Sequence, residues 1–291
     1  MKLTQLSALV AAAALSLGAN AEPFYMIVPD GVVDNQTANT YQFGIDFQAT
    51  SNYSDTDLSY DGVNAATFVT AGDAVNDTGF GTVSSLLGSN GLAMTANGLD
   101  EGMGDNWQLS FNYNINGVVV AVDNSGLLNN PPAQGIGAFY GDGVVDGDNL
   151  IQIYYDVLDV NGNVLSSVSV MNLEVLASSG TIGNAVFYAA VDFTGVDAMA
   201  QSLFFFADGS NWYDLWVDGQ PLPGIEIAAR IDSNIDPQTV PVVDAETGIA
   251  SRTNTLNGSV EFNRVPEPGS LALLGMGLLG LGLGRRYFKQ A

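Results

Sequence analysis

Alternating apolar and polar residues recur along most of the chain and predict β-strands. The clearest case is the pair of runs 149–159 and 164–171, which flank the segment Val160-Asn161-Gly162-Asn163. Asn-Gly between two such runs indicates a tight turn, because both central residues of a type I′ turn need a positive φ. Residues 149–171 are therefore expected to form a β-hairpin.

Further strands are predicted by the same alternation between Gly- and Asn-rich turns. They cover residues 41–47, 107–113, 118–122, 186–193, 202–207, 212–217 and 259–263. Residues 114–117 and 208–211 are expected to be the turns of two more hairpins. Helical periodicity is weak. The predicted fold class is all-β, with an antiparallel β-sandwich or jelly-roll-like body over residues 22–264.

Two stretches of the body are less clear. Residues 65–99 are rich in Gly, Ser and Asn with scattered apolar residues, which fits long loops or a short helix. Residues 232–253 are polar and hold Pro237 and Pro241, which favours a loop or a stalk. We see no fixed-period repeat and no boundary that divides the body into two domains.

The N-terminal segment has the pattern of a secretory signal peptide. Lys2 precedes an apolar, Ala-rich run over residues 6–17, and Ala19-Asn20-Ala21 forms a small-x-small cleavage site. Residues 1–21 are therefore predicted to form a signal helix that is removed on export, with Glu22 as the mature N-terminus.

The C-terminal segment combines three features. Pro266-Glu267-Pro268 leads into the apolar, Gly-rich run 271–283, and Arg285, Arg286 and Lys289 follow. The apolar run gives about 20 Å of helix, which is less than the roughly 30 Å of a bilayer core. The basic side chains extend its reach by snorkelling to the interface, so a transmembrane helix is predicted within residues 265–291.

Together these three features resemble the PEP-CTERM sorting tail of exported proteins in Gram-negative bacteria. The resemblance covers residues 265–291 only and carries no catalytic residues. It implies recognition by an exosortase, a membrane enzyme that would cut near Pro266, Glu267 and Pro268. The protein would be held briefly in the inner membrane and then reach the cell surface or the medium.

Composition excludes several classes of function. The chain has no cysteine and no histidine, and both lysines lie outside residues 22–264. Disulfides, catalytic thiols, His-based triads, His-ligated zinc and Lys Schiff bases are therefore absent from the body. Three arginines face thirty acidic residues in the body, and this negative field repels nucleic acid while favouring solubility and divalent cations.

One candidate metal site is the acidic loop that contains Asp142, Asp146 and Asp148. Calcium takes six to eight oxygen ligands, and the interspersed glycines let a loop fold around the ion. The alternative is that Asp-Gly and Asn-Gly are simply turn formers, both here and at residues 159–163. Calcium is the one cofactor that the sequence suggests.

A candidate carbohydrate site is formed by Trp212, Asp214 and Trp216. On a strand these three side chains share one face, which we expect to point outward, while Tyr213 and Leu215 point inward. Flat aromatic rings beside a carboxylate can stack on sugars and bind hydroxyl groups. The alternative is that the tryptophans pack in the protein interior.

The sequence favours a non-enzymatic protein. The family resemblance implies a structural or adhesive component of an extracellular polysaccharide matrix. The second reading is a carbohydrate-binding module, stabilised or not by calcium. The third is a glycan-processing enzyme, although no spacing of acidic residues singles out a catalytic pair. The expected partners are an exosortase and an exopolysaccharide.

Overall fold

The computed structural model describes residues 21–56, 69–94, 99–123, 135–141, 147–181, 184–218, 226–234, 241–244 and 246–265. Strands dominate these ranges. The strands are β1 (Phe24–Met26), β2 (Gln42–Ser54), β3 (Ala74–Leu87), β4 (Trp107–Asp123), β5 (Gly135–Tyr140), β6 (Leu150–Leu158), β7 (Val164–Thr181), β8 (Asn184–Asp192), β9 (Phe204–Phe206), β10 (Ile227–Asn234), β11 (Val242–Asp244) and β12 (Ile249–Arg264). The helices are the 3₁₀ helix η2 (Ala198–Ser202) and the α-helix α2 (Trp212–Asp218).

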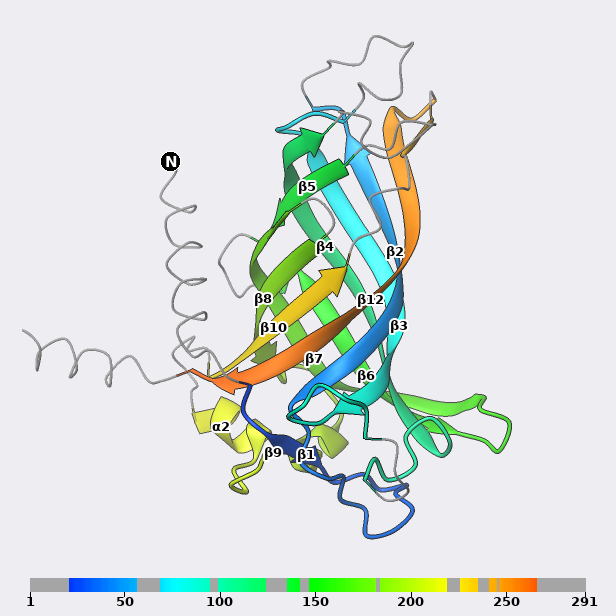
Figure 1. Cartoon of the computed structure of the whole chain (residues 1–291), viewed down its shortest axis with the longest axis vertical. Coiled ribbons are helices and arrows are strands. Elements are labelled where there is room, and N and C mark those ends of the chain that lie inside the picture. The colour runs from blue at the N-terminus through cyan, green and yellow to red at the C-terminus, as the bar shows by residue number, and fades with distance from the viewer. Residues whose placement is uncertain are drawn as a thin grey trace, which may run out of the picture.

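Most of the strands form one antiparallel sheet that closes on itself (Figure 1). The order around it is β2, β3, β4, β6, β7, β8, β10 and β12, and β12 pairs with β2 on one side and β10 on the other. Closure pairs the edges that an open sheet would leave exposed. The all-β class is confirmed, but the two-layer sandwich is wrong for the described residues: the pairing is continuous, so the core lies inside one sheet.

β5 and β6 act together as one interrupted strand beside β4. β5 pairs with the second half of β4 and β6 with the first half. The loop between them is tied to β7, because Glu174 accepts hydrogen bonds from the backbone N–H groups of Gly147 and Asn149. At Gly141, where φ is 83°, a Cβ would lie 2.6 Å from the carbonyl oxygen of Leu176, so the loop start needs glycine.

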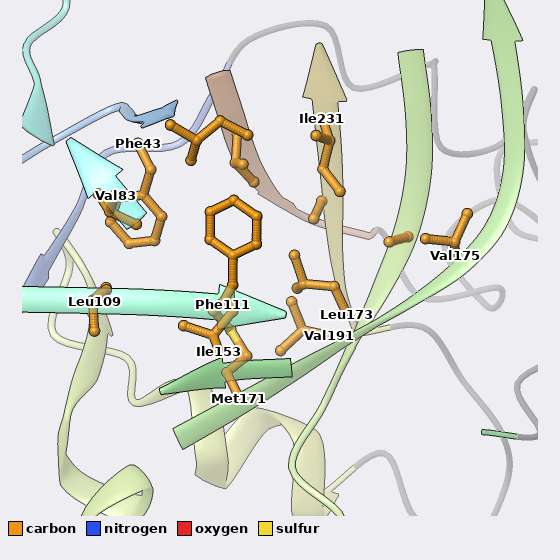
Figure 2. Close-up of a cluster of buried hydrophobic side chains, with 14 of the residues drawn as sticks. Phe43, Val83, Leu109, Phe111, Ile153, Met171, Leu173, Val175, Val191 and Ile231 are labelled. Atoms are coloured by element: carbon orange, nitrogen blue, oxygen red, sulfur yellow. The ribbon is translucent and has the colours of Figure 1, made fainter. Parts of the chain in front are cut away.

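Alternate residues of each strand point into the closed sheet. On β2 these include Phe43, Ile45 and Phe47, all buried. Figure 2 shows the ring of Phe111 surrounded by side chains from other strands, among them those of Ile153 on β6 and Ile231 on β10. The strand period of two therefore places one face of each strand in a shared core.

One end of the closed sheet is sealed by a small two-stranded sheet and α2 (Figure 1). β1 pairs with β9, which sets Phe24 opposite Phe206. Trp212 of α2 is fully buried, with its ring centroid 4.9 Å from that of Phe262, 5.0 Å from Phe206 and 5.3 Å from Phe204. We call Phe24, Phe43, Phe204, Phe206, Trp212 and Phe262 the aromatic cluster.

The hairpin at residues 149–171 is confirmed, with β6 and β7 as its strands. Its turn differs from the predicted type, because Gly162 has a φ of 77° while Asn161 is not in the positive-φ region. Asp159 holds the turn: its Oδ1 accepts hydrogen bonds from the backbone N–H groups of Asn161 and Asn163. This turn is the structural alternative foreseen for Asp-Gly and Asn-Gly segments.

Two predicted connections are wrong. Residues 114–117 do not turn, because Asn114 to Gly117 continue β4 and Ile115 is buried in the sheet interior. Gly117 is needed for close packing, since a Cβ there would lie 2.7 Å from Cδ1 of Tyr140. The pair of strands expected at 202–207 and 212–217 is instead β9, which pairs with β1, and the helix α2.

Two stretches that seemed irregular contain strands. β3 occupies much of residues 65–99, and its glycines leave room for neighbouring aromatic rings: a Cβ on Gly79 or Gly81 would collide with Tyr113 or with Phe47 and Phe111. Residues 232–253 include the end of β10, all of β11 and the start of β12. Neither a stalk nor a helix is found in the described parts of these stretches.

Candidate ligand-binding site

The interior of the closed sheet contains a cavity of about 80 Å³. Most of its wall is apolar and comes from strands on all sides of the sheet (Figure 2). Representative wall residues are Phe47, Phe111, Ile153, Leu173, Phe187 and Ile231. This apolar part of the wall favours apolar atoms, because its side chains offer water no hydrogen-bond partner.

A polar cluster lines the part of the cavity away from the aromatic cluster. Arg252 on β12, Ser51 on β2 and Asp77 on β3 are direct cross-strand neighbours, since Ser51 is in register with both of the others. Their inward side chains therefore form one row across three strands. Tyr113 of β4 and Tyr140 of β5 extend this row around the cavity. We call these five residues the polar row.

Asp77 is the centre of the hydrogen bonding. Its Oδ2 accepts from the hydroxyl of Tyr140 at 3.1 Å and from Oγ of Ser51 at 3.3 Å. Its Oδ1 accepts from the hydroxyl of Tyr113 at 3.4 Å. Three neutral hydroxyl donors thus converge on one carboxylate from three strands.

Burial changes the acidity of this row. Desolvation raises the pKa of Asp77 to about 6, although the hydrogen bond from Tyr140 and the charge of Arg252 work in the opposite direction. The pKa values of Tyr113 and Tyr140 are also raised by burial and by the Asp77 charge. Both phenols consequently stay protonated and remain hydrogen-bond donors at neutral pH.

Arg252 is the unusual member of the polar row. Its exposed fraction is 6%, and its Nε and Nη1 atoms are buried without a hydrogen-bond partner among the described residues. Its guanidinium lies 5.5 Å from the ring centroid of Tyr53, which gives a cation–π contact. The cavity therefore has a cation with unused donors at its polar end.

The proposed carbohydrate residues do not form an outward-facing row. Trp212 is fully buried in the aromatic cluster, and Trp216 is half-buried with its ring centroid 5.9 Å from that of Phe193. Asp214 is exposed, because a helix distributes these residues over different faces. The overlooked signal is Asn211-x-x-Asp214: the Asn211 side chain caps α2 by accepting from the Asp214 N–H.

The proposed calcium loop falls mostly outside the described residues. Asp142 and Asp146 belong to that part, whereas Asp148 is described and lies beside Asn149, where the loop meets β7. Among the described residues, no three acidic side chains come together in a way that could hold a metal ion. Calcium binding at residues 142–148 stays a prediction.

Comparison with known proteins finds a match, which lies in the C-terminal segment. The family model of the PEP-CTERM protein-sorting motif matches residues 264–286. The chain carries this motif, as its Pro-Glu-Pro tripeptide, apolar run and basic end predicted. The motif supports export, sorting to the cell surface and processing by an exosortase. No curated protein and no solved structure matches the chain.

The sorting residues Pro266, Glu267 and Pro268, the predicted signal helix and the predicted transmembrane helix lie outside the described residues, apart from Ala21 and Val265 at the two boundaries. Within the described ranges, no helix is long and apolar enough to cross a membrane.

Sequence reasoning did not identify the polar row. Arg252 is about two hundred residues from Ser51 in the chain, and it belongs to the range 232–253, for which the sequence predicts a loop or a stalk. One signal was available: Ala250, Arg252 and Asn254 alternate with polar residues of the other face, in a body with only three cations. Arginine is rarely fully buried unless it is paired, so an arginine on the inward face of a strand is an unusual residue.

Proposed function

We propose that this protein is an exported, non-enzymatic binding protein that holds a small ligand inside its closed sheet. The observation that supports this most is the cavity, whose walls are apolar and whose polar groups gather at one end. Ligand sites in proteins typically combine an apolar lining with a few convergent polar groups. The expected ligand has an apolar body and one polar end.

Delivery follows from the sorting motif. Residues 265–291 hold the protein in the inner membrane until an exosortase cuts near Pro266–Pro268, and the body then serves at the cell surface or in the surrounding matrix. Intact mass of the protein from its native host should show a C-terminus close to residue 265. A mature protein that still ends at Ala291 would contradict this processing.

Binding in the cavity can be tested by titrating the purified full chain with 1-pentanol and following methyl NMR signals. The methyls of Ile153, Leu173 and Ile231 should shift, because these residues line the cavity. Those of Val164 and Leu165, which are 50% and 67% exposed, should not shift. An affinity of about 0.1 to 1 mM is expected for a ligand of this size.

A matched pair of variants separates the cavity from other apolar surfaces. Ala138→Phe places a ring at a wall position of the cavity, whereas Val120→Phe adds the same ring at a residue that is 58% exposed. Binding should be lost only in the first variant. Equal shifts in both variants would show that pentanol binds elsewhere, and the proposal would fail.

A second candidate function is polysaccharide binding on the outside of the sheet. A shallow groove there is lined by Phe80, whose exposed fraction is 63%, and by Asn112 and Tyr154. The Asn112 amide donates to the Tyr154 hydroxyl at 3.1 Å, and the Gln108 amide donates to Asp156 at 3.1 Å. An exposed ring beside fixed amides and carboxylates suits stacking on a sugar ring with hydrogen bonds to its hydroxyls.

This second candidate keeps the predicted role in the matrix but moves it to other residues. Co-sedimentation with exopolysaccharide should weaken about three- to tenfold in Phe80→Ala, as expected for loss of one aromatic contact. Trp216→Ala should leave it unchanged. No co-sedimentation of the wild-type protein would remove polysaccharide from the list of partners.

A further inference from the structure

The three arginines of the body are in different situations. Arg230 forms ion pairs with Asp232 and Glu261, and Arg264 is 2.7 Å from Asp208. Arg252 forms no ion pair with any described carboxylate, although it is the most buried of the three. A guanidinium stays charged at all relevant pH values, so Arg252 cannot avoid the cost of burial by losing a proton.

Asp77 does not neutralise Arg252 directly. Its two oxygens accept hydrogen bonds from the hydroxyl groups of Ser51, Tyr113 and Tyr140, and it forms no ion pair with Arg252, although the Arg252 charge lowers its pKa. The Tyr53 hydroxyl interacts with the guanidinium, but the Nε and Nη1 groups of Arg252 have no hydrogen-bond partner among the described residues and are left for another acceptor. The cavity that Arg252 lines is the place where such an acceptor could bind.

Resting on the proposed function of the cavity, we infer that its ligand is a short-chain carboxylic acid, bound with the carboxylate on Arg252 and the hydrocarbon against the apolar wall. Arginine suits carboxylates because its N–H groups match their two oxygens. The apolar side chains of Phe111, Ile153 and Ile231 offer no partner to a second polar group. A cavity of about 80 Å³ fits a hydrocarbon chain of roughly three to four carbons, because an apolar cavity of about 150 Å³ holds the six carbons of benzene.

The count of charges favours a carboxylate over a phosphate ester. A phosphate monoester carries about −1.5 to −2 charges at neutral pH and presents three oxygens. Arg252 is the only cation that lines the cavity, and the chain has no lysine or histidine between residues 22 and 264. Asp77 already brings a carboxyl group to this end of the cavity, so a ligand with one negative charge is accepted beside Arg252 at a lower cost than a phosphate with nearly two.

Also near Arg252, Asn254 is buried with its Oδ1 atom unpartnered among the described residues, and it lines the same cavity. Its amide group has both donors and an acceptor. The unpartnered Oδ1 is an acceptor and cannot bind a carboxylate, so only the Nδ2 group of Asn254 could donate to a ligand beside Arg252.

The test compares pentanoate with its neutral isostere pentanamide on the full chain, by NMR titration of the cavity methyls. Wild-type protein should bind pentanoate at least tenfold more tightly. Arg252→Met, which keeps much of the side-chain volume without the charge, should lose that preference while still binding pentanamide. Arg252→Lys, which keeps the charge, should recover part of the preference.

The outcomes separate the two proposals. Pentanamide bound as tightly as pentanoate, or an unchanged preference in Arg252→Met, would overturn the carboxylate assignment and leave the cavity function in place. Absence of binding by both molecules, or binding that survives Ala138→Phe, would overturn the cavity function as well. Thermal melts of both Arg252 variants confirm folding, and Arg252→Lys decides the question if Arg252→Met does not fold.

Discussion

At one end of the closed sheet the interior is filled by aromatic rings, whereas the other end holds a row of polar groups beside an unfilled space. The aromatic cluster has ring centroids about 5 Å apart, and its one polar side-chain atom, Nε1 of Trp212, is buried without a partner among the described residues. The polar row has a buried arginine with unpaired donors and an aspartate with a raised pKa. The first end resembles an ordinary protein core, and the second is costly unless a ligand uses it.

The contrast separates stability from function within one sheet. Burial of aromatic rings is among the largest favourable contributions to folding, while buried polar groups without partners reduce stability. Buried groups with shifted pKa values, such as Asp77, are common at functional sites. Variants at the aromatic cluster should therefore change stability, and variants in the polar row should change binding and pH dependence.

The largest effect is expected for Trp212→Ala. This side chain is fully buried among Phe204, Phe206 and Phe262, so its removal leaves a large cavity and should cost about 3 to 5 kcal/mol of unfolding free energy. Chemical denaturation measures the change. Trp216→Ala, at a half-buried position, is the control and should cost less than half as much. Equal losses would mean that the aromatic cluster is not the main support of this end.

The next effect concerns pH. Because burial raises the pKa of Asp77 to about 6 from 3.8, the folded protein holds a proton between these values that the unfolded chain has lost. The contribution of Asp77 to stability therefore falls as pH rises through this window, by about 3 kcal/mol for two units. Asp77→Asn removes this dependence.

The free energy of unfolding of Asp77→Asn, measured relative to wild type, should therefore be higher at about pH 7.5 than at about pH 4, by up to about 3 kcal/mol. Denaturation of both proteins at the two pH values gives the difference. If the difference in unfolding free energy between the variant and the wild type is the same at both pH values, Asp77 has an ordinary pKa.

Calcium is expected to have a smaller effect on stability. If residues 142–148 bind the ion, a calcium concentration tenfold above the dissociation constant adds about 1.4 kcal/mol to stability. Thermal melts with millimolar calcium or chelator test this, with Asp146→Asn as the variant and Asp159→Asn as the control. An unchanged melting temperature would contradict calcium binding at residues 142–148, and the Asp-Gly pairs there would be turn formers only.

The smallest effect is expected for Tyr140→Phe. It removes one hydroxyl that donates to Asp77 at 3.1 Å, which should cost about 1 kcal/mol and raise the pKa of Asp77 further. Tyr113→Phe, whose hydroxyl is 3.4 Å from Asp77, should cost less. The carboxyl signal of Asp77 in a pH titration by NMR follows both changes, and a pKa that does not move would show that the hydroxyls are not bound to it.

Much of the secondary structure was predictable from residue periodicity, because alternation reports a strand with one buried face. It succeeded for β2, β6, β7 and β8. It failed for β3, where Gly79 and Gly81 replace inward side chains so that rings from neighbouring strands fit. A glycine-rich inward face carries no apolar signal, and a single sequence does not show which rings fill the gap.

Closure of the sheet and the polar row were not predictable, because both depend on contacts between distant parts of the chain. β12 pairs with β2, about two hundred residues earlier, and this pairing brings Arg252 beside Ser51. Trp212 and Trp216 show the opposite case. Their spacing fitted a strand with both rings on one face. The residues form a helix instead, which Asn211 caps and which covers one end of the closed sheet.

The chain enters and leaves the closed sheet at the same place. The Glu22 N–H donates to the Phe262 carbonyl, and the Glu22 carboxylate lies 3.1 Å from Nε of Arg264. Along β12, Arg252 is twelve residues from Arg264, or about 40 Å of strand. Under the proposed membrane tether beyond residue 265, the aromatic end would be the attached end and Arg252 would lie far from it, so one cut near residue 265 would release the molecule with the proposed binding end intact.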